Sequence, residues 1–545
     1  MASPLASTSA TAVASYSSSV RPAYPHATFT TTYLDTDDQP ISFADSSSSS
    51  SSTASISAPI QEPFRRARIT SSGPLTSRSL TLASSALASS LPVAFPTETV
   101  YGLAANSLCP QACEAIFAAK GRPQDNPLIV HVSDLDMAER IIKEGWREPK
   151  AYEVLMREFW PGGITFLMPA ARDGKAKGEA LITAHHPLVG IRMPSHPLAR
   201  ALIAQSNLPL AAPSANASGR PSPTTAQHVM YDLGGALDAL RAGGTIGSAD
   251  HKGRIPYILD GGASRQGVES TVIDGVTSPD ELRILRPGAV GPEEIEACLR
   301  SAGLLAGPEE QPEVLVNSNG SEGGKVKLKV YGKDMARQSS FEANPTTPGM
   351  KYRHYSPNAP VVLFVPTEQG QETAIDWQEA ISKEIHALLD ARQTNGNGHT
   401  LSESLKVGLM LLADSALSQA IFSTPDAYSD KAMTQSLGPS FLLSLSSTSS
   451  SSDSSAKTGV EVEVHPFSLG NLSSPHLPAR RLFSGLRTLD EGPLHRQACK
   501  VTLDGEEERG GVDLIIVEAV QDEGIGLAVM NRVGKAAGGT VKVSV

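Results

Sequence analysis

The chain has 545 residues, which is enough for about three or four domains of ordinary size. Lys and Arg number 46 against 57 Asp and Glu, and the net charge of −11 argues against a protein that coats nucleic acid with its whole surface, although a local basic face is compatible with it. Four cysteines exclude a disulfide scaffold. The sequence contains no apolar run of about 20 residues, so it predicts no transmembrane helix.

Residues 1–75 form a Ser-rich N-terminal extension that we expect to be disordered. The segment is rich in Ser, Thr, Ala and Pro, with a serine homopolymer at 46–52, and it offers too little apolar area to offset the entropy of ordering. Up to Leu34 it is Ser-rich and acid-poor, as transit peptides are, but Arg21 is its only basic residue. We therefore expect a cytoplasmic protein and leave a mitochondrial form open.

Residues 76–304 predict a first α/β domain. An apolar helix face lies at 80–87, and a second helix ends at IFAAK (116–120). The strand candidates are LPVAF (91–95), LIVHV (128–132), ITFLMPA (164–170), VGIRMP (189–194), LPLAAPS (208–214), STVID (270–274) and LRILR (282–286). Strands and helices that mix without alternating strictly indicate an α/β or α+β sheet domain.

Residues 305–358 predict a linker, because they are rich in Gly, Pro, Asn and Ser and contain one strand-like run, KVKLKVYG (325–332). From 359 to 545 the runs VVLFVP, VGLMLLA and DLIIVEAV predict strands. Helices are expected between and after them at 368–392, 476–492 and 527–538. This βαβ-like order predicts a smaller, Rossmann-like α/β domain. A serine tract at 444–455 predicts a surface insertion in it.

The common nucleotide and metal motifs are missing from the sequence. It contains no G-x-x-x-x-G-K-[ST] phosphate loop, no complete G-x-G-x-x-G and no H-E-x-x-H. Cys109 and Cys113 lie four apart, but no second Cys or His pair is near them, so we expect thiols and no zinc site.

Polar residues gather in two segments near the start of the first domain. FPTETVYGLAAN (95–106) places Thr97, Glu98 and Thr99 directly after a buried strand, where a ligand often binds in open α/β sheets, although a threonine-capped turn explains it equally well. KGRPQDNPLIVH (120–131) holds Lys120 and Arg122 on a proline-stiffened loop. That pattern favours a polyphosphate site over a solvated basic turn.

Further candidates lie downstream. PSANASGRPSPT (213–224) is a turn-rich segment of hydroxyls and backbone N–H groups, which suits either an anion-binding concavity or a plain surface loop. Arg192 lies inside the otherwise apolar VGIRMP, and Arg286 lies between Leu285 and Pro287. Each of these arginines must find an anion or leave the edge of the core.

These segments resemble the YrdC-like threonylcarbamoyl-AMP synthase family. FPTETVYGLAAN, KGRPQDNPLIVH, WPGGIT, VGIRMPSHP, APSANASGRPSPT, GVESTVID and ILRPG follow one another in the family's order. PGMKYRHYSP (348–357) is similar to the linker motif of the long, two-domain form. The resemblance covers about residues 91–357, and the remaining C-terminal part is compatible with that form.

The resemblance implies a fold and a reaction. The first domain would be a twisted open sheet with a basic concave site, which binds ATP and L-threonine and uses bicarbonate or CO₂. The products would be L-threonylcarbamoyladenylate and pyrophosphate, and Mg²⁺ would arrive mainly on ATP. A downstream transferase would then move the threonylcarbamoyl group onto tRNA, to form threonylcarbamoyladenosine.

The same motifs imply site residues. L-Threonine would be held by Thr99, His131, Arg192, the backbone of Ala212 and Ser270, and ATP by Lys120, Arg122, Asn126, Ser214, Ser222, Arg286 and Tyr355, with Thr165 and Asn216 as secondary candidates. The resemblance implies no catalytic nucleophile, and Lys120, Arg192 and Arg286 would position the reacting groups. The threonine amine must lose a proton, to His131, Glu98 or water.

Two other functions fit parts of the sequence. A double-stranded RNA or tRNA binder without synthase activity would use a basic concave surface, but the acidic chain lacks aromatic stacking repeats. A carbamoyltransferase of the hydrogenase-maturation type would carry C-x-x-C zinc fingers, and none is present. Release of pyrophosphate with threonine and bicarbonate separates a synthase from a binder.

Overall fold

The computed structural model describes most of the chain between residues 29 and 545. The described ranges are 29–45, 51–54, 64–171, 181–236, 238, 252–278, 280–307, 324–335, 354–367, 374–394, 405–423, 437–438, 440–445, 460–498 and 511–545. The chain divides into two compact units: the first is Met1–Ser218 with Ser222–Tyr352, and the second is Gly219–Pro221 with Arg353–Val545. Within the described ranges no helix has both the length and the apolar character of a membrane span.

The first unit is built on a mixed sheet of eleven strands in the order β1-β11-β5-β6-β10-β7-β9-β8-β12-β13-β14. In chain order these strands are β1 (Thr32–Leu34), β5 (Val93–Phe95), β6 (Gly102–Asn106), β7 (Ile129–His131), β8 (Ile164–Pro169), β9 (Leu188–Arg192), β10 (Leu210–Ala211), β11 (Tyr257–Leu259), β12 (Thr271–Asp274), β13 (Glu281–Arg286) and β14 (Lys327–Val330). All seven strand candidates of the predicted first domain overlap one of them.

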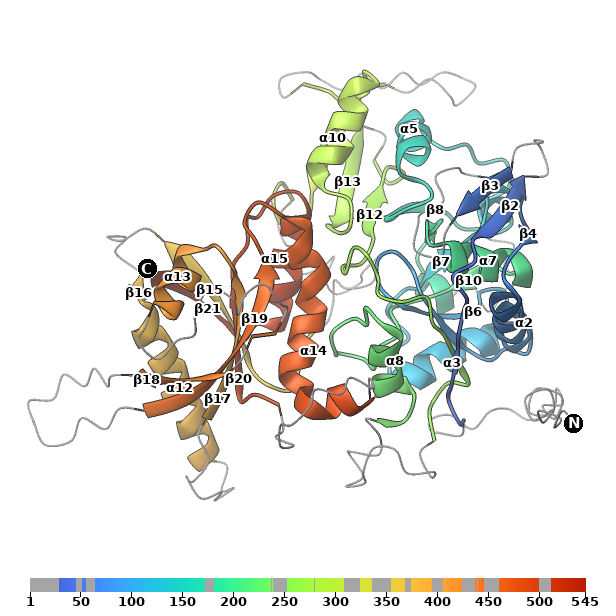
Figure 1. Cartoon of the computed structure of the whole chain (residues 1–545). Helices are drawn as coiled ribbons and strands as arrows, with labels where there is room; N and C mark the ends of the chain where they lie inside the picture. The colour runs from blue at the N-terminus through green and yellow to red at the C-terminus, as the bar shows by residue number, and fades with distance from the viewer. Residues whose placement is uncertain are drawn as a thin grey trace, which may run out of the picture. The chain divides into compact units, whose positions relative to one another are not determined.

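Helices accompany this sheet. They are α2 (Pro74–Ala88), α3 (Pro110–Lys120), α4 (Leu135–Glu139), α5 (Lys150–Phe159), α7 (Pro197–Ser206), α8 (Ala226–Leu233) and α10 (Pro292–Ser301). The apolar face predicted at 80–87 belongs to α2, which buries Leu80, Ala83 and Leu87 and packs beside α7 (Figure 1). The predicted mixed α/β fold is confirmed.

The large sheet is strongly curled. Phe95 ends β5 and His131 ends β7, and the strands β6 and β10 lie between them. In a flat sheet these two residues would be at least about 14 Å apart, since three strand spacings of about 4.8 Å separate them. Their rings nevertheless meet edge to face at a centroid distance of 5.9 Å. The curl therefore brings the end of β5 close to His131.

Part of the extension that we expected to be disordered is folded. β1 pairs with β11 at the edge of the large sheet, and β2 (Ile41–Asp45), β3 (Ser51–Ala54) and β4 (Ala67–Ser71) form a separate three-stranded sheet. Ile41 and Phe43 are fully buried, and Phe43 packs on Phe64, which lies under the guanidinium of Arg200 in α7. These few large apolar side chains suffice because they pack on a helix of the first unit. Residues 1–28, 46–50 and 55–63 lie outside the described ranges.

The predicted linker also contains part of the first unit. β14 lies in KVKLKVYG and extends the large sheet by pairing in parallel with β13. It could not be recognised as part of that sheet from composition, because it is an edge strand with half-exposed lysines and only Val330 fully buried. Within PGMKYRHYSP, residues 348–353 lie outside the described ranges.

The second unit has a seven-stranded sheet in the order β16-β21-β15-β20-β17-β19-β18, parallel except for β18. Its strands are β15 (Val361–Thr367), β16 (Ile375–Asp376), β17 (Leu405–Leu412), β18 (Phe441–Leu445), β19 (Val460–Gly470), β20 (Leu514–Glu518) and β21 (Gly539–Ser544). Its helices are α12 (Trp377–Thr394), α13 (Ala416–Phe422), α14 (His476–Ala498) and α15 (Ile525–Ala536).

This second sheet has helices on both faces. α12 and α13 cover one face, and α14 and α15 cover the other (Figure 1). The strands β15, β17 and β20 correspond to the three apolar runs that predicted them, and the predicted Rossmann-like architecture is confirmed. The first helix begins at Trp377, later than expected. The serine tract lies outside the described ranges except for its first two residues, which end β18.

The folded part of the extension supports the first turn of α2, which generates a stability prediction. Gly73, the residue before α2, offers no capping side chain, and Asp37 instead accepts hydrogen bonds from Leu75 N (3.0 Å) and from Thr76 Oγ1 (3.1 Å). Asp37→Ala should lower the free energy of unfolding by about 1 kcal/mol, as loss of a helix cap does. Urea denaturation followed by circular dichroism measures the change. Asp38→Ala, at the exposed neighbouring position, is the control. Equal denaturation midpoints for the two variants would contradict the capping role.

Candidate functional site

Five polar residues of the first unit lie at matching positions on neighbouring strands. His131 on β7 pairs with Arg192 on β9, and Arg192 pairs with Thr165 on β8. Val272 on β12 pairs with both Thr165 and Arg286, and Ser270 directly precedes β12. We call His131, Arg192, Thr165, Ser270 and Arg286 the polar edge. Sheet register therefore gathers residues that are scattered over 156 positions of the sequence.

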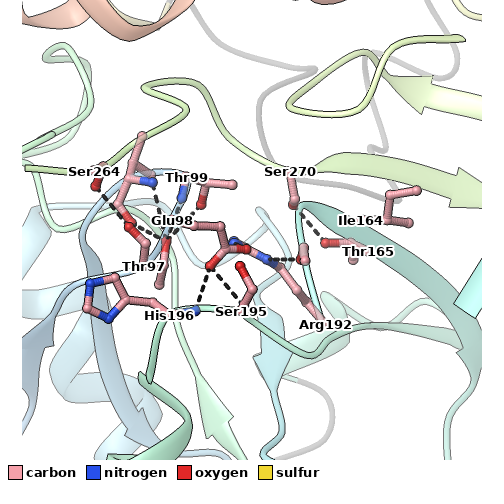
Figure 2. Close-up of polar contacts among 12 residues, drawn as sticks. Thr97, Glu98, Thr99, Ile164, Thr165, Arg192, Ser195, His196, Ser264 and Ser270 are labelled. Carbon is pink, nitrogen blue, oxygen red and sulfur yellow. Dashed lines mark hydrogen bonds and ion pairs between the residues drawn. The ribbon is translucent and has the colours of Figure 1, made fainter. Parts of the chain in front are cut away.

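The centre of this arrangement is a buried ion pair between Arg192 and Glu98 (Figure 2). Arg192 Nη2 lies 2.5 Å from Glu98 Oε1, and the side chains are 5% and 2% exposed. The second carboxylate oxygen of Glu98 accepts hydrogen bonds from Ser195 N (3.0 Å) and His196 N (3.3 Å), and Arg192 Nε donates to Gly162 O (3.2 Å). The sequence predicted that Arg192 either finds an anion or leaves the edge of the core, and Glu98 supplies the anion.

Burial and the ion pair together set the protonation of this part of the site. Burial alone would raise the pKa of Glu98, but the charge and hydrogen bond of Arg192 outweigh burial and lower that pKa below its ordinary value. Burial and then the charge of Arg192 lower the pKa of His131 to about 3, and burial lowers the pKa of His196 to about 4. At neutral pH the site therefore contains a carboxylate, a guanidinium and two neutral imidazoles.

Hydroxyl groups lie on both sides of this pair. Thr97 Oγ1 and Thr99 Oγ1 are 2.8 Å apart, and Ser264 Oγ donates to Thr97 O (3.0 Å) (Figure 2). Along the polar edge, Thr165 Oγ1 and Ser270 Oγ are 2.7 Å apart. Arg286 Nη2 donates to Ser270 O at 2.8 Å and to Ser270 Oγ at 3.1 Å. The hydroxyl of Ser270 therefore joins Thr165 to the second buried arginine.

A third buried cation, Lys120, fixes the start of the 213–224 segment. It ends α3, is 3% exposed, and donates from Nζ to Ser214 O and Asn216 O at 2.5 Å each. Ser214 Oγ donates to Asn216 Oδ1 (2.6 Å), and Ser222 Oγ donates to Glu269 Oε1 (2.5 Å). Residues near both ends of segment 213–224 are thus held by hydrogen bonds to other first-unit residues. The segment is therefore more than a polar surface loop.

The remaining candidate residues are Arg122, Asn126, Ala212 and Tyr355. Arg122 is partly exposed and donates to Pro127 O (3.1 Å), while Asn126 is buried with no hydrogen-bond partner for Oδ1 among the described atoms. Ala212 lies opposite Ile129, at the other end of β7 from His131, and its N–H donates to Ile129 O (2.9 Å). Tyr355 belongs to the second unit, where its ring stacks on Phe483 at 5.2 Å.

The sequence analysis missed two contributors to the site. The main-chain N–H groups of Ser195 and His196 orient Glu98, and a backbone role leaves no signal in residue type. The other contributor is Gln266, whose N–H donates to Glu98 O (2.8 Å) and whose buried Oε1 has no hydrogen-bond partner among the described atoms. A buried unpaired amide oxygen is costly, which makes Gln266 a further candidate for ligand contact. Its place directly before GVESTVID was the available signal.

Metal ligands do not cluster in the parts of the chain that the structure describes. No group of three or more His, Cys, Asp or Glu side chains is arranged to hold a metal ion there. Glu98 is engaged by Arg192, and Glu269 accepts from Ser222.

Fold and motifs together define an α/β enzyme with a YrdC-like domain followed by a second domain. Residues 85–288 match the family model Sua5_yciO_yrdC, described as "Telomere recombination", and residues 290–538 match the model described as "Threonylcarbamoyl-AMP synthase, C-terminal domain". The chain belongs to the threonylcarbamoyl-AMP synthase family, in its long two-domain form.

Individual relatives agree with this assignment over most of their length. The chain is 33% identical over 497 residues to the threonylcarbamoyl-AMP synthase of Schizosaccharomyces pombe, covering 88% of this chain and 92% of that relative. It is 32% identical over 449 residues to the Bacillus subtilis enzyme, with coverages of 82% and 90%. The crystal structure of Pyrococcus abyssi Sua5 complexed with L-threonine is similar in fold, with a TM-score of 0.52, 31% identity and coverages of 86% and 96%.

The buried pair generates a pH-dependent prediction. Because Glu98 has a folded-state pKa below its unfolded value near 4.5, its pair contributes stability that is fully present above pH 4.5 and is lost as the pH falls below it. Glu98→Gln should therefore cost about 3 kcal/mol at pH 7, as removal of one partner of a buried pair does. The difference from the unsubstituted protein should shrink below pH 4.5. Denaturant unfolding at pH 7 and at pH 4 tests this, and a difference that is the same at both would contradict it.

Proposed function

We propose that the polar edge and the 213–224 segment form the active site of this chain. The chain is a threonylcarbamoyl-AMP synthase, a nucleotidyltransferase that makes L-threonylcarbamoyladenylate and pyrophosphate from L-threonine, bicarbonate or CO₂, and ATP, for threonylcarbamoyladenosine modification of tRNA. The proposed location of the site rests on one observation. Three cations, Lys120, Arg192 and Arg286, are each at most 5% exposed and are held in place by oxygen atoms of the surrounding loops and strands.

This charge distribution suits the chemistry. The threonine amine adds to CO₂ and gives a carbamate. A carbamate oxygen then attacks the α-phosphorus of ATP, so one O–P bond forms while the bond to the bridging oxygen breaks and pyrophosphate leaves. Because the carbamate is itself the nucleophile, the protein needs no Ser or Cys nucleophile. Its work is to hold three anions together and to offset their charge.

The proton of the threonine amine has three candidate acceptors. His131 has a pKa of about 3, and Arg192 holds the pKa of Glu98 below its ordinary value, so neither group retains a proton near neutral pH. A base is effective when its pKa lies near the working pH. We therefore assign the proton to water and give Glu98 the role of orienting Arg192.

Roles for the other residues follow from their positions. We assign the threonine carboxylate to Arg192, with Thr99, His131, Ser270 and the carbonyl of Ala212 around the amino acid. We assign the phosphates to Arg286, Lys120 and Arg122, with Asn126, Ser214, Ser222 and Tyr355 completing the ATP site and Thr165 and Asn216 supporting it. Mg²⁺ enters as part of MgATP, since phosphate oxygens supply the hard ligands that it prefers.

The product is a mixed anhydride that a second enzyme must use. We propose that the partner is a downstream transferase, which carries the threonylcarbamoyl group to tRNA. Direct contact of this chain with tRNA or other double-stranded RNA is a separate prediction. The cytoplasmic location and a mitochondrial form also stay predictions. A protein that only binds RNA would release no pyrophosphate when threonine and bicarbonate are added.

Arg286 offers the first test of the phosphate site. Arg286→Ala removes a buried cation whose charge-assisted contact is worth roughly 1.5–3 kcal/mol, so kcat/KM should fall about tenfold to a hundredfold. Pyrophosphate release measures the rate. Arg283→Ala, on the same strand but paired with Glu281 at 2.8 Å, serves as the matched control and should keep its rate. Rates within threefold for both variants would remove Arg286 from the site.

Substrate choice tests the amino-acid pocket. L-Threonine should be strongly preferred to L-valine, because a pocket that bonds the hydroxyl is left with unpaired polar groups by an isostere that lacks it. L-Serine should be poorer by the loss of one methyl contact, about 1 kcal/mol. Pyrophosphate release with each amino acid gives the order. Equal turnover of threonine and valine would show that the hydroxyl-rich surroundings of Thr99 and Ser270 do not bind the side chain.

A further inference from the structure

Gln266 lies in a part of the first unit that is fixed beside Glu98. Its own N–H donates to Glu98 O (2.8 Å). The next residue, Gly267, donates from N to Thr99 O (3.0 Å), and its φ of +75° is a conformation that glycine adopts without strain. The main chain of Gln266 is therefore held next to the residue whose carboxylate binds Arg192.

The side-chain amide of Gln266 lies beside Gly163, the residue directly before β8. A Cβ added at Gly163 would lie 2.9 Å from Gln266 Oε1 and 2.8 Å from Ala289 Cβ, so the amide has room only because this residue is glycine. The preceding residue, Gly162, accepts a hydrogen bond from Arg192 Nε (3.2 Å). The amide of Gln266 and the guanidinium of Arg192 therefore lie beside two adjacent residues of the chain.

Two polar atoms beside these glycines have no hydrogen-bond partner within the described part of the chain. Gln266 Oε1 is buried and accepts no hydrogen bond there, which costs free energy unless a ligand or water supplies a donor. Arg192 uses Nη2 for Glu98 and Nε for Gly162, and its Nη1 makes no hydrogen bond to a described residue. An α-amino acid carries the two complementary groups, an amine and a carboxylate, on one carbon atom.

We propose that Gln266 Oε1 accepts a hydrogen bond from the amine of L-threonine while Arg192 binds the carboxylate. This inference rests on the proposed function of the polar edge. When the free amine adds to CO₂, an N–C bond forms, one C–O double bond opens to carry the negative charge, and one proton passes from nitrogen to water. The carbamate keeps one N–H, so Oε1 holds the nitrogen before and after this step. A neutral amide oxygen orients the amine without retaining its proton.

The test compares L-threonine with (3R)-3-hydroxybutyrate, a competitive inhibitor that would keep the carboxylate and the hydroxyl but lacks the amine. Gln266→Met, in the full-length protein, keeps the volume of the side chain and removes the acceptor. We expect KM for L-threonine to rise roughly tenfold, the scale of one lost hydrogen bond, while KM for ATP and the inhibition constant of (3R)-3-hydroxybutyrate change less than about threefold. Pyrophosphate release measures all three constants.

The matched control is Gln205→Met in the same unit. Gln205 is exposed on α7, and its amide donates to Thr81 Oγ1 (3.1 Å). This variant should keep the KM for L-threonine of the unsubstituted protein. Gln266→Glu keeps an acceptor oxygen on a side chain of the same length, and it should recover part of the threonine affinity that Gln266→Met loses.

Two results would overturn the inference. An unchanged KM for L-threonine in Gln266→Met would show that water alone meets Oε1. An equal loss of affinity for L-threonine and for (3R)-3-hydroxybutyrate would show that Gln266 binds the hydroxyl or only shapes the pocket. Should Gln266→Met fail to fold, the same comparison with Gln266→Ala decides. An unsubstituted protein that releases no pyrophosphate would instead refute the proposed function itself.

Discussion

A guanidinium buried in a protein needs an anion or a set of oxygen atoms around it, and this requirement organises the first unit. Arg192 would not be stable at the end of an apolar strand without Glu98, and Glu98 in turn is held by the main-chain N–H groups of Ser195 and His196. The pair spans the curl of the large sheet, since Glu98 follows β5 and Arg192 ends β9. Site and fold are therefore stabilised by the same contact.

The same contact, together with burial, keeps Glu98 ionised and His131 neutral at pH 7. A carboxylate that neutralises an arginine has a low pKa, and a buried imidazole beside that arginine stays neutral. In the proposed site, both effects keep protons off the groups around the reacting atoms. A reaction whose nucleophile is a carbamate tolerates this arrangement, because the substrate brings the nucleophile and the protein has to position anions.

Much of the fold could be predicted from the sequence, because apolar runs such as LIVHV and VVLFVP form buried strands and the α2 face repeats with the helical period. The strands at 32–71 could not, since their burial depends on packing of Phe43 and Phe64 near α7, far along the chain. In the site, residue types and motif order led to Arg192, Arg286 and Lys120. The main-chain donors at Ser195 and His196 were missed because a backbone role leaves no signal in residue type, and Gln266 was missed although it directly precedes a motif.

The account is tested most directly by identifying the product made by the purified full-length protein with MgATP, L-threonine and bicarbonate. Mass spectrometry of the reaction should detect L-threonylcarbamoyladenylate together with an equal amount of pyrophosphate. Omission of threonine or bicarbonate should abolish both signals. Pyrophosphate release that does not depend on threonine, or no adenylate under any of these conditions, would contradict the assignment of this reaction to the chain.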